Sequence, residues 1–355
     1  MVRTPPVSPH ERSTRARWRR GLVGAGITLV ATATVAVTGP IGSSRAGAAG
    51  LDPRAAVSAQ LTWQQVLPDG GAPIAQSSPI VATLDGGGPS VVVGDRGGNV
   101  WAFHLSNGSG VAGWPAHTGG PPVDSTPSVV PNGSGTDNVY VGGGNASNPS
   151  VGGYYGFNSS GATIWAQSAP DPNGFHGVQA SLAAGPMSGV TGVVAPSLGQ
   201  DEYAFNAANG GLLPGWPFFT ADSGFSTPSI ADLNGNGAHE IVEGGDSTAG
   251  LANGVQYANG GHLRILGPNG SLLCDHDFNQ TIDSSPAVGN FLGGGGVGIA
   301  FGTGTFYPGA SDSNKVYATD AYCNVVWGTD VGAGTTSSPA LGDLLGNSSV
   351  EVVEG

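Results

Sequence analysis

The chain has 355 residues, of which 64 are glycine and 10 % are charged, and its formal net charge is −13. The glycines follow no G-X-Y period, which excludes collagen, and a hydrophobic content of 39 % is too high for a disordered chain. Two cysteines are too few for a disulfide scaffold. Glycine weakens helices but supplies positive φ in tight turns, so we expect an all-β protein rich in turns.

Residues 1–48 have the three parts of a secretory signal peptide. Seven of the eleven basic residues lie in the first 45 positions, an uncharged segment runs from Gly21 to Gly39, and Ala46-Gly47-Ala48 forms a cleavage site. We expect cleavage, a linker over 49–60, and export by the Sec route in preference to the twin-arginine route that Arg19-Arg20 would allow. The alternative is that the apolar segment is retained as a membrane anchor.

Removal of the leader changes the charge balance and the expected partners. Four basic and 23 acidic residues would remain, which gives a net charge of −19. Four scattered basic side chains cannot form a phosphate-binding patch, so we expect no nucleic-acid partner and no membrane partner after cleavage. The acidic balance favours divalent cations.

Beyond residue 75 one short phrase recurs at intervals of about 50 residues, as expected of a repeat architecture. Its copies are Ser77-Ser78-Pro79, Ser125-Thr126-Pro127, Ser226-Thr227-Pro228, Ser284-Ser285-Pro286 and Ser337-Ser338-Pro339, with a degenerate copy at Gln179–Ala183. Each unit reads as four short strands separated by glycine-rich turns, and such units form the blades of a β-propeller. Over 61–355 we expect five full blades and a partial sixth, with a truncated C-terminus and six or seven blades in a complete chain.

Tryptophan recurs near the end of four units, and Leu61-Thr62-Trp63-Gln64 resembles the outer strand of a further blade. The tryptophans are Trp114, Trp165, Trp216 and Trp327. Aromatic side chains at a repeat period are typical of core packing, so we expect them to lie between blades and assign them no ligand.

The fourth unit contains a candidate calcium loop. Oxygen-bearing side chains occur at positions 1, 3, 5 and 9 of the loop, glycine occurs at position 6, and position 7 offers a backbone carbonyl. The expected ligands are Asp232, Asn234, Asn236, Ala238 and Glu240. Two acids and two amides predict a weak site for one Ca²⁺ ion. The alternative is an ordinary Asn-Gly hairpin turn with surface acids.

The run from Ser226 to Val242 resembles an FG-GAP or VCBS repeat, the calcium-bearing blade unit of integrin-α-like propellers. The resemblance implies that the hairpin between the first two strands holds calcium through the five residues named above. It covers about residues 60–355 and is specific in the fourth unit alone. The sixth unit keeps Asp343, Asn347 and Glu351 but has Leu345 at the third ligand position, so we expect an impaired site there.

Other segments are similar to the repeats of quinoprotein-like propellers, among them Val316–Asp320 with Trp327. Enzymes of that group hold pyrroloquinoline quinone near adjacent cysteines and basic residues. Here Cys274 and Cys323 are 49 residues apart and basic residues are scarce, so we expect no quinone cofactor. Whether the two cysteines form a disulfide is left open by the sequence.

No HExxH, Walker A or G-x-S-x-G motif occurs. We expect Gly293–Gly298, which matches G-x-G-x-x-G, to be a turn, and Asp275-His276-Asp277 to face solvent at a strand edge. The leading hypothesis is a secreted or cell-surface, monomeric, calcium-stabilised propeller that binds a protein or carbohydrate ligand without catalysis. The alternative is an extracellular glycoside hydrolase or polysaccharide lyase with carboxylates on the propeller axis.

Overall fold

A computed structural model describes residues 59–248 and 259–355, so the expected signal peptide and nearly all of the expected linker lie outside the described residues. Within these ranges the chain forms 22 strands and no helix. The described part therefore contains no helix that could cross a membrane. The all-β expectation is confirmed, and a compact unit begins at Trp63.

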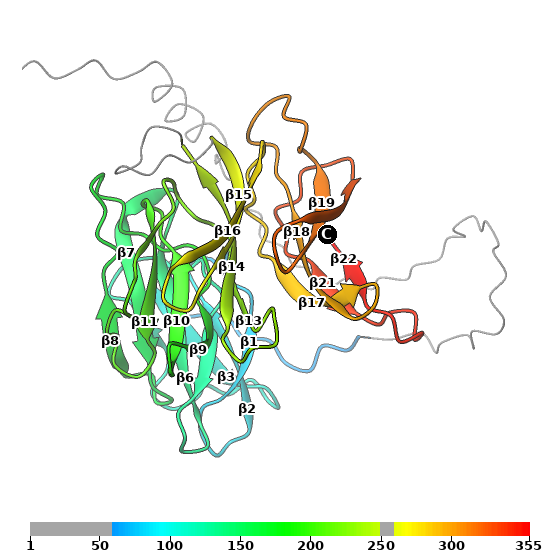
Figure 1. Cartoon of the computed structure of the whole chain (residues 1–355). Helices are drawn as coiled ribbons and strands as arrows, with labels where there is room; N and C mark the ends of the chain where they lie inside the picture. The colour runs from blue at the N-terminus through cyan, green and yellow to red at the C-terminus, as the bar shows by residue number, and fades with distance from the viewer. Residues whose placement is uncertain (1–58, 249–258) are drawn as a thin grey trace, which may run out of the picture. The chain divides into compact units, whose positions relative to one another are not determined.

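The strands form five four-stranded antiparallel sheets and one two-stranded sheet (Figure 1). Blade 1 contains β1 (Ile80–Thr83), β2 (Pro89–Gly94), β3 (Asn99–His104) and β4 (Ala116–His117), and blade 2 contains β5 (Ser128–Pro131), β6 (Asp137–Asn145), β7 (Asn148–Phe157) and β8 (Thr163–Gln167). Blade 3 contains β9 (Ala183–Met187), β10 (Val190–Pro196), β11 (Asp201–Asn206) and β12 (Phe218–Phe219), and blade 4 contains β13 (Ser229–Ala231), β14 (Glu240–Ser247), β15 (Gly260–Leu266) and β16 (Leu272–Phe278). Blade 5 contains β17 (Ala287–Leu292), β18 (Gly296–Gly302), β19 (Lys315–Asp320) and β20 (Val325–Asp330), and the last sheet contains β21 (Ala340–Gly342) and β22 (Glu351–Val353).

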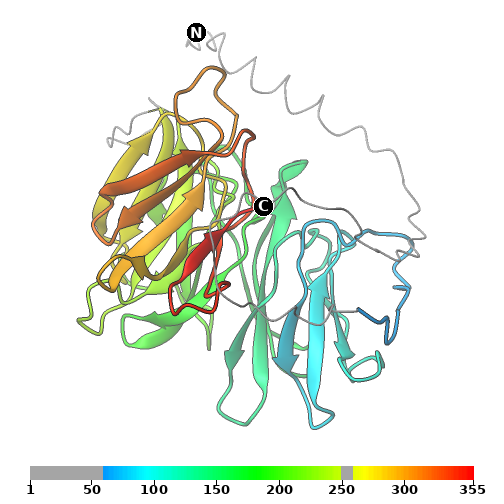
Figure 2. The same cartoon turned by 90° about the vertical axis from the view of Figure 1, so that its right-hand side faces the viewer.

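This order is that of a β-propeller, and it confirms the five blades and two further strands expected from the repeat. First strands of consecutive blades lie side by side, as β5, β9, β13, β17 and β21 do in chain order (Figure 2). Of the expected turn Gly293–Gly298, Gly293–Gly295 connects β17 to β18 as a hairpin turn, whereas Gly296–Gly298 begins β18.

The apolar core is divided into four clusters, and each cluster lies between two neighbouring blades. Val193 of β10 packs against blade 2, whereas the next residue, Val194, packs against blade 4. Ile241 and Val242 of β14 divide in the same way between blades 3 and 5. Successive side chains of a strand point to opposite faces, so blades 2, 3 and 4 bury both faces because each has a blade on either side.

The repeated Ser/Thr-Pro phrase links the blades through hydrogen bonds. At its second position, the backbone N–H donates to the side-chain hydroxyl of its counterpart one blade later. The pairs are Ser78 to Thr126 (3.0 Å), Thr126 to Ser181 (2.8 Å), Ser181 to Thr227 (3.2 Å), Thr227 to Ser285 (2.9 Å) and Ser285 to Ser338 (3.3 Å). Ser181 takes part, so the degenerate copy of the phrase keeps its structural role. We refer to these six residues as the hydroxyl ladder.

The first serine of the phrase accepts a hydrogen bond from within its own blade. Ser226 Oγ accepts the N–H of Gly244 at 3.2 Å, and the same bond joins Ser77 to Gly94 and Ser125 to Gly142. A Cβ atom at Gly244 would lie 2.8 Å from the carbonyl oxygen of Ile282, in the segment that connects β16 to β17 of the next blade. Glycine is therefore required where this strand approaches its neighbour.

Trp114, Trp165 and Trp216 each donate a hydrogen bond to the following blade, as expected. Trp327 is partly buried on β20. Trp165 is 6 % exposed, and its Nε1 donates to the carbonyl of Ala207 in blade 3 at 2.8 Å. Trp63 Nε1 makes the equivalent bond to Leu105 of blade 1 at 2.8 Å. Trp63 and Gln65 thus contact blade 1 as residues of an outer strand would, although they lie in no strand.

Candidate functional site

The predicted calcium ligands lie in the hairpin that connects β13 to β14. Asp232 Oδ1 accepts the N–H of Asn236 at 3.0 Å, and its Oδ2 accepts the N–H of Gly237 at 2.8 Å. These backbone donors, that of Gly237 first, lower the pKa of Asp232. Gly237 has a φ of +85°, which allows the sharp turn, and Asn236 Oδ1 accepts the N–H of Ala238 at 2.7 Å. The loop therefore folds around the side-chain oxygens of Asp232 and Asn236.

Glu240 closes the loop from the first position of β14. Glu240 is only 4 % exposed, and its Oε2 accepts the N–H of Leu233 at 2.9 Å. Its Oε1 accepts from Nδ2 of Asn234 at 3.3 Å. Asn234 Oδ1 in turn accepts the N–H of Asn236 at 3.1 Å, so every side chain of the predicted ligand set is held in place.

The donor chemistry of this loop fits a hard cation. The available groups are carboxylate and amide oxygens, which Ca²⁺ prefers. Each oxygen named above accepts one hydrogen bond and keeps a further lone pair. If calcium binds, Asp232, Asn234, Asn236, the carbonyl of Ala238 and Glu240 would hold it, and the ion would cross-link the two ends of the hairpin.

The sixth unit repeats the loop's backbone geometry with a poorer ligand set. Asp343 accepts the N–H groups of Asn347 at 3.0 Å and Ser348 at 2.9 Å, and Glu351 accepts that of Leu344 at 2.8 Å. Leu345 contributes no side-chain oxygen at the third position.

A second group of acids lies at the opposite end of β14, and sequence reasoning did not identify its members. Burial and the nearby charge of Asp222 raise the pKa of Asp246 to about 7, and the same causes raise that of Asp283 to about 6. Tyr307 Oη donates to both carboxylate oxygens of Asp246 at 2.8 Å. Phe306 packs edge-on against Tyr307 and is 43 % exposed. Carboxyls of shifted pKa beside aromatic rings are typical of ligand sites.

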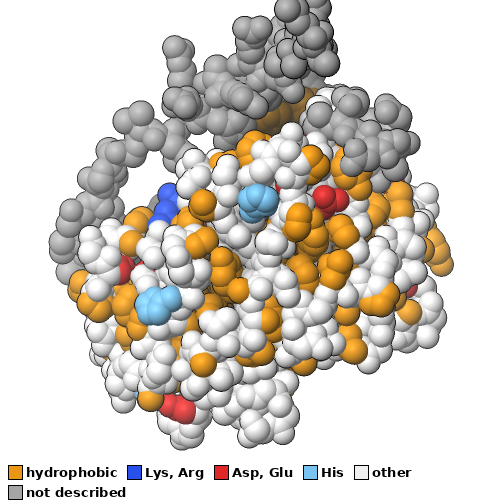
Figure 3. All heavy atoms as spheres, turned by 90° about the vertical axis from the view of Figure 1, so that its left-hand side faces the viewer, with side chains coloured by type: hydrophobic (Ala, Val, Ile, Leu, Met, Phe, Trp, Pro, Cys, Tyr) orange, Lys and Arg blue, Asp and Glu red, His pale blue; other side chains and the backbone are white. Residues whose placement is uncertain are grey.

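Basic side chains are few, and each lies within ion-pair distance of an acid. Arg96 contacts Asp124 at 2.7 Å, Arg264 contacts Glu243 at 3.0 Å, and Lys315 contacts Asp312 at 4.0 Å. These three are all the basic residues that the described ranges contain. On the face drawn in Figure 3, charged side chains are isolated among hydrophobic and uncharged ones.

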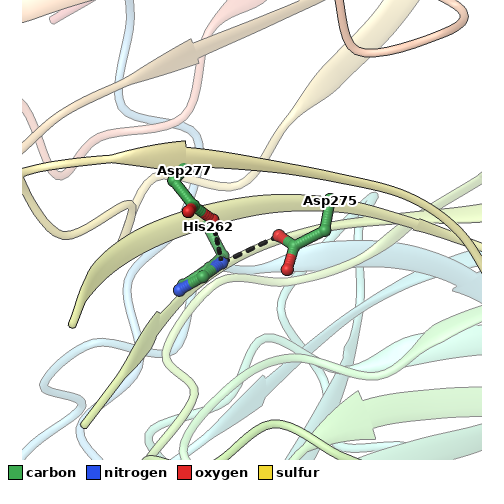
Figure 4. Close-up of side chains that lie close together, drawn as sticks. All are labelled: His262, Asp275 and Asp277. Atoms are coloured by element: carbon green, nitrogen blue, oxygen red, sulfur yellow. Dashed lines mark hydrogen bonds and ion pairs between the residues drawn. The ribbon is translucent and has the colours of Figure 1, made fainter. Parts of the chain in front are cut away.

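The expectation that Asp275, His276 and Asp277 face solvent at a strand edge holds for Asp277, which is exposed on the edge strand β16, but Asp275 and His276 are half-buried. Asp275 and Asp277 point toward His262 on the neighbouring strand (Figure 4). His276 lies between them on the opposite face of β16 and packs against Phe278. Side chains alternate along a strand, so the two acids share a face that the histidine between them cannot reach.

Buried charges also lie between blades 3 and 4. Arg264 is fully buried, donates to Glu243 Oε1 and to the carbonyl of Thr220 at 3.2 Å, and lies over the ring of Phe218. Glu202 is fully buried beside this pair, and its burial and the charge of Glu243 raise its pKa well above the usual value.

The two cysteines of the chain form a disulfide. Cys274 of β16 and Cys323, in the turn between β19 and β20, have Cα atoms 6.3 Å apart and are bonded. The bond joins blade 4 to blade 5 and answers the question that the sequence left open.

Comparison with known proteins gives the fold. No family model and no curated protein matches the sequence. The chain is similar to the C-terminal domain of PilY1 from Pseudomonas aeruginosa, with a TM-score of 0.54 and 13 % identity over 78 % of this chain and 82 % of that one. It is similar to Sqt1 from Saccharomyces cerevisiae, with a TM-score of 0.50 and 13 % identity over 75 % and 66 % of the two chains. BamB from Moraxella catarrhalis gives a TM-score of 0.47 and 14 % identity over 72 % of this chain and 64 % of BamB, less than two thirds of its length. The resemblance to FG-GAP or VCBS repeats stays a prediction.

Proposed function

We propose that this chain is a secreted or cell-surface binding module, in which calcium stabilises the β13–β14 hairpin and the opposite end of the blades binds the ligand. The observation that carries the binding surface is the group formed by Asp222, Asp246, Asp283 and Tyr307. Carboxylates accept hydrogen bonds from sugar hydroxyls, and the exposed ring of Phe306 offers an apolar face beside them. Carbohydrate and protein ligands both remain within the proposal.

The charge distribution supports this choice of ligand. Each of the three basic side chains of the described residues already lies within 4.0 Å of an acid, and three separate basic groups form no patch for a phosphate backbone. Ligands rich in hydroxyl groups or basic groups suit an acidic surface better than anionic ones do. Nucleic acid is therefore outside the proposal.

Calcium has a structural role in this proposal. The Asp232–Glu240 loop lies at the other end of β14 from Asp246, so the ion would stabilise the blade without touching the ligand. Chelation should lower the melting temperature of the purified protein, and Asp232→Ala should remove that response. An unchanged melting temperature with and without chelator would contradict the calcium part.

A specific observation favours a second candidate function, a glycoside hydrolase. With a pKa of about 7, Asp246 holds a proton near neutral pH, as the general acid of such an enzyme must, and neighbouring Asp222 would be the second carboxylate.

One pair of assays distinguishes the two functions. The full chain and Asp246→Asn are tested for binding to glycan and protein arrays and for release of reducing ends from a polysaccharide panel. The binding module predicts a bound ligand that is recovered intact, with weaker binding in the variant. Turnover by the unmodified chain that Asp246→Asn abolishes would replace the binding proposal with the enzyme.

A further inference from the structure

Adjacent strands of blade 4 bring three metal-ligating side chains together. His262 of β15 lies directly opposite Asp277 of β16 in the strand register, and Asp275 lies two residues away on the same face. His262 Nδ1 is 2.8 Å from Asp275 Oδ1 and 3.1 Å from Asp277 Oδ1 (Figure 4). The three candidate ligand atoms all lie within 4.8 Å of one another.

Packing of the blade fixes the imidazole. Leu263 and Ile265, the alternate residues of β15, belong to the apolar cluster shared with blade 5. His262 and Arg264 therefore point to the other face, toward blade 3. The side chain of His262 is fully buried, whereas that of Asp277 is 56 % exposed. The group thus combines a rigid nitrogen donor with a carboxylate that an ion can reach from solvent.

The charges around the group leave an excess of negative charge. Arg264 is the basic side chain beside it, with Nε 3.9 Å from Asp275 Oδ1. The same guanidinium is bonded to the buried carboxylate of Glu243 at 3.0 Å, which balances its charge. Asp275 and Asp277 then face one imidazole, and a divalent cation would neutralise the pair.

We propose that His262, Asp275 and Asp277 bind a divalent first-row transition metal, with water in the remaining coordination positions. Ligand atoms at right angles around an octahedral ion at about 2.1 Å lie about 3.0 Å apart, close to the observed 2.8 and 3.1 Å, whereas around a tetrahedral ion they lie about 3.4 Å apart. Imidazole nitrogen suits Zn²⁺ and Fe²⁺, and carboxylates suit Mn²⁺, whereas Ca²⁺ and Mg²⁺ prefer oxygen alone. The site is chemically distinct from the all-oxygen loop at Asp232.

The competing occupant is a proton. A proton on Nδ1 would also join the imidazole to the two carboxylates, and it would leave no place for a metal.

The test is a titration of the untagged full chain with Zn²⁺, followed by calorimetry, in excess Ca²⁺ to occupy oxygen-only sites. We expect saturation at one Zn²⁺ per chain and an affinity about tenfold or more lower in Asp277→Asn. Asp277→Asn is the main variant because the exposed side chain of Asp277 can change without loss of the fold. His262→Ala is the second variant. His276→Ala is the matched control, since it removes an imidazole from β16 on the face opposite to Asp275 and Asp277.

Electron paramagnetic resonance with Mn²⁺ gives an independent readout, because bound Mn²⁺ loses its free-ion signal. Absence of saturable Zn²⁺ and Mn²⁺ binding would overturn the proposal and assign the cluster to a hydrogen-bonded histidine. So would binding that is equally strong in Asp277→Asn and in the unmodified chain, or binding that only His276→Ala removes.

Discussion

Glu240 Oε2 accepts the backbone N–H of Leu233 at 2.9 Å, so the last residue of the Asp232–Glu240 loop is hydrogen-bonded to its second residue. The pair formed by Glu351 and Leu344 repeats this bond at 2.8 Å in the β21–β22 hairpin. The two loops therefore share one backbone geometry and differ in their ligand sets, which makes each a control for the other.

The pair of loops gives the first prediction. Asp232→Ala should abolish the effect of calcium on the melting temperature, whereas Asp343→Ala should leave that effect intact, because Leu345 already deprives the sixth loop of a ligand. Differential scanning fluorimetry with Ca²⁺ and with chelator measures both. A calcium response that depends on Asp343 and not on Asp232 would reverse the assignment.

The hydroxyl ladder gives the second prediction. Thr227→Val keeps the shape of the side chain but removes the acceptor of the Ser181 N–H, which lies at 3.2 Å. Loss of a partner for a partly buried N–H costs about 1–3 kcal/mol of unfolding free energy. Urea unfolding measures the loss, and Ser134→Ala in the exposed β5–β6 turn is the control. Equal stability of the two variants would show that the ladder contributes nothing.

Glu202 gives the third prediction. Its pKa is raised above the unfolded value of 4.5, so the folded state holds a proton that the unfolded state releases. Protonated Glu202 therefore contributes to the free energy of unfolding in full below pH 4.5, and this contribution is lost as the pH rises toward the pKa of the folded state. Glu202→Gln mimics the protonated form and should unfold at a higher urea concentration than the unmodified chain at about pH 8, with a smaller difference at about pH 5.

The matched variant is Glu243→Gln. It removes the charge bonded to buried Arg264, which costs about 3–5 kcal/mol, so it should destabilise the protein at both pH values. If Glu202→Gln destabilised the protein as much as Glu243→Gln does, Glu202 would be ionised in the folded protein.

Asp246 gives the fourth prediction. Burial and the charges of Asp222 and Asp283 raise its pKa, whereas the Tyr307 hydroxyl and the Ser247 N–H lower it, with a net value of about 7. Tyr307→Phe removes one of the lowering contacts and should raise the pKa further. Carboxyl ¹³C NMR titration of the full chain measures this change, and a lower pKa in the variant would contradict the assigned hydrogen bonds.

The same group sets a pH window for stability. The pKa of Asp246 rises from 3.8 to about 7 on folding. Its contribution to the free energy of unfolding is therefore present in full below about pH 4 and is lost as the pH rises to 7. Asp246→Asn should flatten the stability profile across this window in urea unfolding. A profile that stays as steep as that of the unmodified chain would assign the slope to other acids.

The sequence by itself determined the blades and the loop at Asp232. Strand alternation, turn residues and the repeated Ser/Thr-Pro phrase are local patterns, and they recur at a period that only stacked sheets explain. The oxygen spacing from Asp232 to Glu240 lies within nine residues, so its geometry follows from the loop alone.

The tertiary structure decided which distant side chains meet. His262 reaches Asp275 and Asp277, rather than His276 doing so, because the β15–β16 register places them on one face. Glu202 meets Glu243 and Arg264 because neighbouring blades stack, and Cys274 meets Cys323 for the same reason. Composition and local periodicity carry no information on register or on which face of a sheet meets its neighbour, since both depend on packing between residues far apart in the chain.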